Sequence, residues 1–176
     1  MSAHLQAIPS QADLEALATR VAEALLGRGE WLATAESCTG GWVAQALTAI
    51  AGSSAWFDRG FVTYSNGAKQ DQLGVPAITL ERHGAVSEPT ARAMAQGVLA
   101  HSQADWSLAT TGIAGPTGGS PEKPVGTVCF AWAGREAGCE ATTARFAGDR
   151  EAVRAQAVAY VLEGLLARLG SGTCLA

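Results

Sequence analysis

The chain has 176 residues, of which 48% are hydrophobic and 16% are charged, which suits one well-buried domain and excludes a disordered or fibrous protein. Its formal net charge of −4 argues against a nucleic-acid-binding protein, because such proteins need a broad basic surface. The four cysteines include no C-x-x-C pair, the N-terminus has no basic-then-apolar signal, and no apolar run reaches the ~18 residues needed to span a bilayer. We therefore expect a cytoplasmic protein that binds neither nucleic acid nor membranes.

Hydrophobic spacing and turn residues predict helices that alternate with strands along most of the chain. In chain order, the predicted elements are helix 11–27, strand 32–36, helix 40–51, strand 55–64, a helix from Ser65-Asn66 to Gly74, helix 79–83, a helix from Ser87 to Ser102, strand 106–111, strand 125–133, strand 140–146 and a last helix that Asp149 begins. The predicted fold class is α/β, a three-layer α/β/α sandwich, and the hairpin of the last two strands makes its central sheet mixed, mostly parallel. This fold fills a single domain over 11–170, between a flexible lead-in at 1–10 and a tail at 171–176.

The turn between the first strand and the second helix carries three side chains suited to nucleophilic chemistry. Ser37, Cys38 and Thr39 lie where backbone N–H groups at a helix N-terminus favour anions and nucleophiles. Gly40 and Gly41 follow, and they allow a ligand to approach the backbone closely. The alternative is purely structural, because Ser and Thr are also preferred at helix N-caps.

Three glycine-containing segments stand at predicted strand ends, namely residues 37–41, 64–69 and 110–119. Ligands collect at the carboxyl ends of strands in open α/β sheets, so the three segments predict one shared pocket. None of them has Walker A or G-x-G-x-x-G spacing, and the three histidines show no metal-ligand pattern. The sequence therefore predicts no cofactor and no metal.

Ser37 and Lys69 are the pair that remains for catalysis. A serine hydroxyl becomes nucleophilic when a base takes its proton, and a lysine serves as that base when burial lowers its pKa. Tyr64, which precedes Lys69, could relay the proton or orient the amine. Two alternatives stay open at this point: Lys69 is an ordinary surface charge, or Cys38 replaces Ser37 as the nucleophile, since a thiol is chemically the better one.

Six motifs follow one another along the chain: T-A-E-S-C-T-G-G, G-S-S-A-W-F-D-R-G-F-V-T-Y-S-N-x-x-K, G-A-V-S-E, T-G-I-A-G-P-T-G-G, K-P-V-G-T-V and F-x-G-D-R. Together they resemble the CinA C-terminal domain family over residues 10–169. The resemblance implies a nicotinamide-nucleotide amidohydrolase, which converts nicotinamide mononucleotide (NMN) to nicotinic acid mononucleotide and ammonia. It also implies that Ser37 is the nucleophile and that Lys69 and Tyr64 assist it. Because the chain lacks the larger metal-dependent N-terminal domain that often precedes this one, it resembles the free-standing form, and no metal is expected.

Further site residues are expected from this mechanism. The N–H groups of Thr39, Gly40 and Gly41 are expected to hold the developing oxyanion. The 5′-phosphate of the substrate is expected to bind the amides of the 112–119 loop with Thr111, or the guanidinium groups of Arg145 and Arg150. The expected substrate-binding residues are Glu36, Cys38, Thr39, Gly40, Gly41, Asn66, Thr111, Gly112, Ala114, Gly115, Arg145 and Arg150.

Several of these assignments have alternatives. Glu36 either orients Lys69 or binds ribose, or it is a structural carboxylate at the start of a helix. Asn66 is interpreted as a helix cap that also touches the ligand, and each arginine is otherwise a surface salt-bridge residue. A homodimer or higher homo-oligomer is expected from the family and the apolar content. Two other functions stay open: a serine amidase or esterase on another small molecule, and a catalytically silent nucleotide-binding regulatory module.

Overall fold

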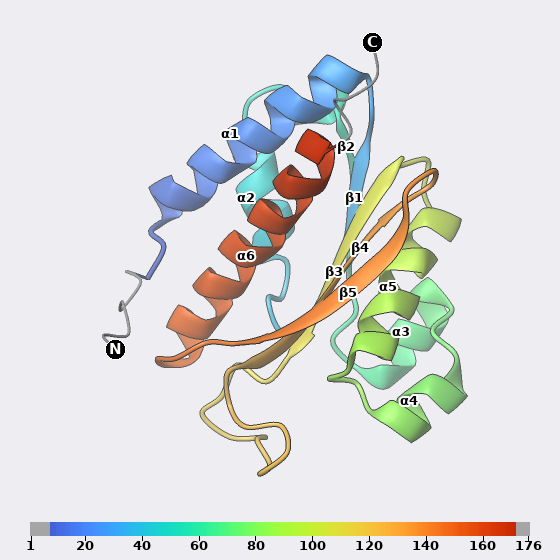
Figure 1. The fold of residues 1–176 in the computed structure, drawn as a ribbon, viewed down its shortest axis with the longest axis vertical. Helices are drawn as coiled ribbons and strands as arrows, with labels where there is room; N and C mark the ends of the chain where they lie inside the picture. Colours follow the sequence, from blue (N-terminus) through green and yellow to red (C-terminus); the bar gives the residue numbers. More distant parts are fainter. Residues whose placement is uncertain (1–7, 172–176) are drawn as a thin grey trace.

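Five strands form one mixed sheet at the centre of the molecule (Figure 1), which is a computed structural model that describes residues 8–171. The strands are β1 (Leu32–Glu36), β2 (Phe57–Val62), β3 (Trp106–Gly112), β4 (Thr127–Gly134) and β5 (Gly138–Arg145), in the sheet order β2-β1-β3-β4-β5. β1 pairs in parallel with β2 and β3, whereas β4 pairs antiparallel with β3 and β5. The predicted mixed sheet is confirmed. The predictions for residues 1–7 and 172–176 lie outside the described residues.

Two layers of helices cover the sheet and complete the predicted three-layer sandwich (Figure 1). The helices on one face are α1 (Gln11–Arg28), α2 (Trp42–Thr48) and α6 (Arg150–Ser171). Those on the other face are α3 (Asn66–Leu73), α4 (Ala77–His83) and α5 (Glu88–Ala100). Each face has its own apolar core, because successive residues of a strand point to opposite sides of the sheet. In β1, Leu32 joins the core beneath α1 and α6, while Ala33 and Ala35 join the core beneath α5.

Two predicted elements are shorter than expected. The helix predicted from residue 40 begins only at Trp42, because Gly40 and Gly41 have left-handed φ angles of 62° and 96° that no helix accommodates. The strand predicted over 55–64 covers only β2, since a 3-10 helix (Ser53–Ala55) precedes it.

The pairing of β1 with β2 contains an irregularity between Leu32 and Ala33, where the register shifts by one residue. Beyond this shift, Arg59 pairs with Ala33 and Phe61 pairs with Ala35. Phe61 therefore packs on the α5 side of the sheet, whereas Phe57, before the shift, packs on the α1 side. The segment that follows β2 consequently continues from the α5 side, where α3 begins.

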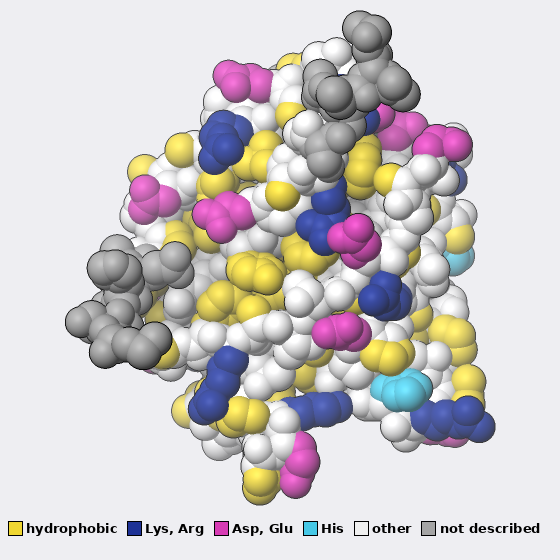
Figure 2. All heavy atoms as spheres, viewed as in Figure 1, with side chains coloured by type: hydrophobic (Ala, Val, Ile, Leu, Met, Phe, Trp, Pro, Cys, Tyr) yellow, Lys and Arg dark blue, Asp and Glu magenta, His cyan; other side chains and the backbone are white. Residues whose placement is uncertain are grey.

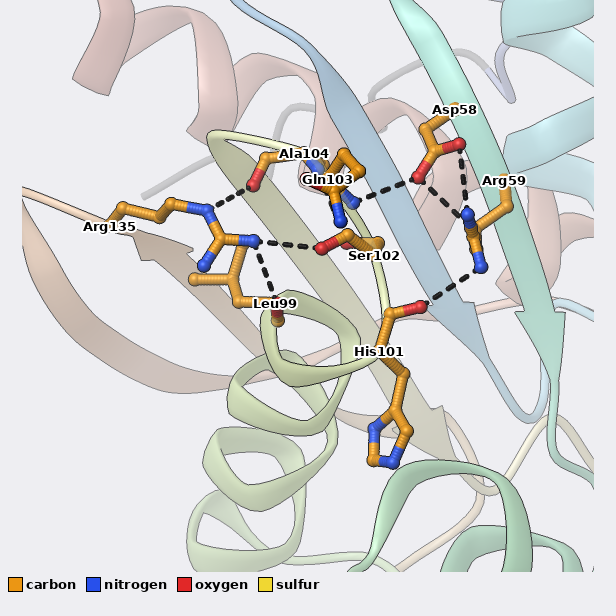
Figure 3. A network of polar contacts seen from close by, with 8 residues as sticks. All are labelled: Asp58, Arg59, Leu99, His101, Ser102, Gln103, Ala104 and Arg135. Atoms are coloured by element: carbon orange, nitrogen blue, oxygen red, sulfur yellow. Dashed lines mark hydrogen bonds and ion pairs between the residues drawn. The ribbon is translucent and has the colours of Figure 1, made fainter.

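The amino-terminal edge of the parallel strands is closed by the connection between α5 and β3, which two arginines hold in place (Figure 3). Arg135 donates three hydrogen bonds of 2.8 to 2.9 Å to backbone carbonyls, that of Leu99 at the end of α5 and those of Ser102 and Ala104 in the connection. Arg59 donates to the carbonyl of His101 at 3.0 Å, and its guanidinium is paired with Asp58. This end of the sheet is therefore fixed by charge-assisted bonds to the backbone.

The face formed by α1 and α6 carries a shallow groove between the two helices, with hydrophobic side chains along it and charged ones beside it (Figure 2). Its lining residues are Pro9, Asp13, Ala16, Leu17, Arg20, Ala159 and Glu163. Within residues 8–171, none of the helices combines the length and apolar character needed to cross a membrane.

Candidate active site

Ser37 is the first residue after β1, at the carboxyl end of the parallel strands. Its N–H donates to the Thr110 carbonyl at 2.9 Å, which extends the pairing of β1 with β3 by one residue. Because side chains alternate along a strand, Ser37 and its neighbour Glu36 point to opposite faces of the sheet. Glu36 contacts the start of α2, and Ser37 faces the helical layer that contains α3.

Lys69 reaches Ser37 from the second turn of α3. Its Nζ lies 3.0 Å from Ser37 Oγ and 2.7 Å from the carbonyl oxygen of Thr63. Lys69 is only 1% exposed, and this burial lowers the pKa of its amine because the charged form loses its hydration. The two side chains that the sequence paired therefore lie in contact, and the alternative of Lys69 as a surface charge is wrong. A buried amine with a lowered pKa is suited to take the serine proton.

The start of α3 positions this lysine. Ser65 is the N-cap residue, and its side chain accepts a hydrogen bond from the Ala68 N–H at 3.1 Å. Asn66, which was expected to cap the helix, is instead its first residue, and its side chain is exposed. Lys69 then lies one turn after the cap, on the face of α3 that packs against the sheet.

Glu36 is fully buried and caps α2 with its carboxylate. Its two oxygens accept hydrogen bonds of 2.6 to 3.0 Å from four donors, namely the Thr39 hydroxyl and the N–H groups of Gly41, Val43 and Ala44. A carboxylate at a helix N-terminus satisfies unpaired N–H groups and complements the helix dipole. The structure therefore places Glu36 in the structural role that was the alternative in the sequence analysis. Within residues 8–171, it makes no hydrogen bond to Lys69.

Cys38 belongs to the apolar core beneath α1 and α6. It is 5% exposed, and burial raises the pKa of its thiol to about 12. The thiolate is the nucleophilic form of cysteine, so a thiol with this pKa is inert near neutral pH. The geometry therefore favours Ser37 over Cys38 as the nucleophile.

Some backbone N–H groups of the turn after Ser37 already donate hydrogen bonds, and others do not. The Gly40 N–H donates to the Ser37 carbonyl at 3.0 Å, and the Gly41 N–H donates to Glu36 at 3.0 Å. Both N–H groups are therefore already paired within the turn, which argues against the expected oxyanion role of Gly40 and Gly41. Among the described residues, the Thr39 N–H has no hydrogen-bond partner, although Thr39 is fully buried.

Tyr64 is close in sequence to Lys69, but among the described residues it makes no hydrogen bond to the dyad formed by Ser37 and Lys69. Its side chain is exposed, and its hydroxyl accepts a hydrogen bond of 2.8 Å from Arg150 at the start of α6. Arg150 also donates to the Gly115 carbonyl at 2.9 Å, which links the 64–69 segment with the 113–126 loop. In the part of the chain that the structure describes, Tyr64 makes no hydrogen bond to Lys69 or Ser37. This arrangement therefore does not support a proton relay through Tyr64.

The remaining predicted residues lie around the same end of the sheet. Thr111 is on β3, buried, and its hydroxyl donates to the Ala85 carbonyl at 2.7 Å. Gly112 ends β3, and a side chain there would collide with the backbone at Thr127, so this glycine is needed for packing. Ala114 is buried in the core, and Arg145 is exposed at the end of β5.

Sequence analysis missed two residues that contact the dyad or its turn. The Thr63 carbonyl holds the lysine amine, and the buried Thr63 hydroxyl has no partner among the described residues. Arg154, on α6, donates to the carbonyls of Cys38 and Thr39 at 3.1 and 2.8 Å. The one available signal for Arg154 is its spacing, since it follows Arg150 by four residues and so shares a helix face with it. Within residues 8–171, no cluster of His, Cys, Asp or Glu side chains is arranged to hold a metal ion.

Comparison with known proteins connects this geometry to a family. A family model described as CinA C-terminal domain matches residues 14–169. The chain is 56% identical over 158 residues to nicotinamide-nucleotide amidohydrolase PncC of Escherichia coli (strain K12), covering 89% of this chain and 94% of that protein. It is 51% identical over 150 residues to the protein of the same name from Pseudomonas putida, covering 85% and 93%. The crystal structure of competence/damage inducible protein CihA from Agrobacterium tumefaciens matches with a TM-score of 0.87 and 47% identity, covering 94% and 99%.

Proposed function

The chain belongs to the CinA C-terminal domain family, and on that premise we propose that it hydrolyses the carboxamide of NMN to give nicotinic acid mononucleotide and ammonia. The relatives named as nicotinamide-nucleotide amidohydrolases support the substrate. The observation that carries the chemistry is the 3.0 Å contact between Lys69 Nζ and Ser37 Oγ, because it joins a nucleophile to a buried base.

The first half of the reaction forms an acyl-enzyme. The neutral amine of Lys69 takes the proton of Ser37 as Oγ bonds to the carboxamide carbon, whose carbonyl oxygen becomes an oxyanion. When the tetrahedral intermediate collapses, the C–N bond breaks and the Lys69 ammonium returns that proton to the leaving nitrogen, which departs as ammonia. The Thr63 carbonyl, 2.7 Å from Nζ, keeps the amine aimed at the serine in both protonation states.

The second half restores the serine. Lys69, neutral again, takes a proton from water as the water oxygen attacks the ester carbon, and the ammonium then protonates Ser37 Oγ as the ester bond breaks. The products are the pyridine carboxylic acid and the free enzyme. In both halves, the N–H groups of Cys38 and Thr39 are the unoccupied donors next to the nucleophile in sequence, and we assign the Thr39 N–H to the oxyanion in place of Gly40 and Gly41.

The other end of the substrate is assigned to the edge where three segments meet. Arg150 joins Tyr64 and Gly115 at this edge, and its guanidinium is partly exposed and positively charged. We therefore place the 5′-phosphate near Arg150, with Arg145 as a second cation, and we keep Tyr64 as a residue that faces the substrate. The expected cytoplasmic location and the expected homodimer remain predictions; gel filtration against the 18.0 kDa chain mass tests the second.

The decisive experiment compares ammonia release from NMN, nicotinamide riboside and nicotinamide. The proposal expects rapid release from NMN and slow release from the two compounds that lack the phosphate. Equal turnover of all three would instead indicate a broader serine amidase. A nucleotide-induced rise in thermal stability without any ammonia release would indicate a catalytically silent binding module.

A further inference from the structure

Arg154 connects the last helix to the turn that carries the nucleophile. From the first turns of α6, its Nε donates to the Cys38 carbonyl at 3.1 Å and its Nη2 donates to the Thr39 carbonyl at 2.8 Å. Its guanidinium also lies 5.3 Å from the ring centre of Trp42, the first residue of α2. One planar side chain therefore holds two consecutive peptide groups at the residues that directly follow Ser37.

The direction of those two peptide groups decides where their N–H bonds point. A trans peptide group is planar, and its N–H points opposite to its C=O. The Cys38 carbonyl and the Thr39 N–H belong to the same peptide group, which is trans. Because the Cys38 carbonyl is directed at Arg154 on the α6 side, the Thr39 N–H is directed away from α6, toward the side of the sheet where Lys69 meets Ser37.

The same argument separates Thr39 from its neighbour. The Thr39 carbonyl is also directed at Arg154, and the Gly40 N–H of that peptide group donates to Ser37 O at 3.0 Å. Among the described residues of this turn, the N–H groups of Cys38 and Thr39 are left without a partner, and of these two the Thr39 N–H belongs to the peptide group whose carbonyl Arg154 binds. An unpaired N–H in a buried residue lowers stability, so such a group calls for an explanation.

We propose that Arg154 is a positioning residue that aims and polarises the Thr39 N–H as an oxyanion donor for Ser37. This inference rests on the proposed function, because it assigns a role within the same acyl transfer. A cation that binds the carbonyl of a peptide group draws electron density from its N–H, so the donor becomes stronger as well as fixed in direction. Arg154 itself touches neither the serine nor the lysine, and its effect passes through one peptide group.

The test replaces Arg154 by methionine, which keeps the length of the side chain and removes the donors. We expect kcat with NMN to fall by about 10- to 100-fold, less than the loss of an oxyanion donor itself, while KM changes by less than about threefold. Arg92→Met is the matched control, because Arg92 also donates to a backbone carbonyl, that of Cys139 at 2.7 Å, far from the turn. The control should leave kcat within about twofold of the wild type.

A second readout separates an oxyanion effect from simple loosening of the fold. In the aldehyde analogue of NMN, Ser37 Oγ would bond to the carbonyl carbon as Lys69 takes the serine proton, and the former carbonyl oxygen would become the oxyanion of a tetrahedral adduct. The carboxyl group of the product nicotinic acid mononucleotide stays planar. Arg154→Met should lower the affinity for the aldehyde analogue by the same factor as it lowers kcat/KM, and it should leave the affinity for the product unchanged. Equal weakening of both ligands, or an unchanged kcat, would overturn the role of Arg154.

Two further measurements keep the inference testable if the methionine variant does not fold. Arg154→Lys retains the charge but cannot bridge both carbonyls, and it should give an intermediate kcat. In the wild-type protein, the amide proton of Thr39 should move downfield when the aldehyde binds, and an unmoved signal would contradict the assignment. If the wild type releases no ammonia from NMN at all, the proposed function fails; if it does and Arg154→Met keeps kcat, only this inference fails.

Discussion

The two ends of the central sheet are built in opposite ways. At the amino-terminal edge, Arg135 and Arg59 satisfy the carbonyls of the α5–β3 connection, and the charges lie in exposed side chains that water also reaches (Figure 3). At the carboxyl-terminal edge, Lys69 is buried, the Thr63 hydroxyl has no partner within residues 8–171, and the Thr39 N–H is unpaired there as well.

This difference indicates that the amino-terminal edge stabilises the fold and that the carboxyl-terminal edge carries the reactive groups. Unsatisfied polar groups cost stability, and proteins tolerate them mainly at functional sites. At the amino-terminal edge, the two arginines are engaged with backbone carbonyls, whereas the carboxyl-terminal edge offers a base, a hydroxyl and an N–H group. Substitutions at the two edges should therefore separate activity from stability.

The largest effect is expected from Ser37→Ala. Removing the nucleophile should lower turnover of NMN by about 10⁴-fold or more, while the melting temperature changes little. Cys38→Ala is the matched control at the next position, and it should retain most of the activity because its buried thiol stays protonated. Steady-state ammonia release and thermal unfolding check both variants. If the cysteine variant were the inactive one, the nucleophile would be the thiol.

Lys69→Met should remove the base and lower kcat by about 10²- to 10⁴-fold. In the wild type, kcat/KM should rise with pH through the pKa of Lys69, which burial lowers. The lowered pKa also makes the stability of the fold depend on pH. Between the lowered pKa and the unfolded value of about 10.4, the unfolded chain binds more protons, so wild-type stability increases with pH. The free energy of unfolding of the methionine variant, relative to that of the wild type, should thus be highest at low pH, and this difference between the two proteins should shrink toward pH 10.

That pH dependence is measured by urea unfolding of both proteins across the range. A stability difference that stays constant from neutral pH to about pH 10 would mean that the amine keeps its hydration in the folded state.

Glu36→Gln should be the largest stability effect at the reactive edge. The variant loses the charge of the α2 cap and places an amide NH₂ against N–H donors, which should cost about 2–4 kcal/mol of unfolding free energy. Glu140→Gln is the control, because Glu140 pairs with Arg168 at a side chain that is 71% exposed. The control should change stability by less than about 1 kcal/mol. Chemical denaturation measures both, and a Glu36 variant as stable as the control would show that the cap is dispensable.

Arg135→Ala tests the amino-terminal edge. Three carbonyls lose a charged donor, but water can replace it in this exposed place, so we expect a loss of only about 1 kcal/mol and an unchanged kcat. A fall in kcat without a fall in stability would show that the two edges are coupled and do not separate activity from stability.

The smallest effect is expected from Tyr64→Phe. The hydroxyl binds Arg150 and not the dyad, so its removal should change kcat by less than about fivefold and act mainly on KM. A proton relay would instead require a fall in kcat of about 100-fold or more. Steady-state kinetics with NMN distinguishes the two outcomes.

The sequence predicted the fold well, because helical spacing and turn residues mark the elements independently of their tertiary neighbours. The pair of Ser37 and Lys69 came from elimination and from the resemblance to the family. The fold explains why it forms, because both residues follow strands that lie side by side in parallel. The sequence left the role of Glu36 open between a site residue and a structural carboxylate at the start of a helix. All five residues of β1 are buried, so no polar alternation shows which face each side chain takes.

Two other features depend on tertiary contacts that leave no local pattern. The left-handed angles of Gly40 and Gly41 fit both a ligand-binding loop and a tight turn, and only the bonding of their N–H groups separates the two. Arg154 contacts the turn from 116 residues away, and nothing near it in sequence indicates that partner.

The separation between Cys38 and Arg154 has a consequence for protein synthesis. A nascent chain contains the serine, the lysine and most of the sheet long before α6 has been translated. Until that helix docks, the peptide group after Cys38 lacks its bond to Arg154, so a ribosome-bound or prematurely terminated product would hold its reactive groups less well aligned. Hydrolytic competence would then appear only at the last stage of folding, when the C-terminal segment closes onto the N-terminal half.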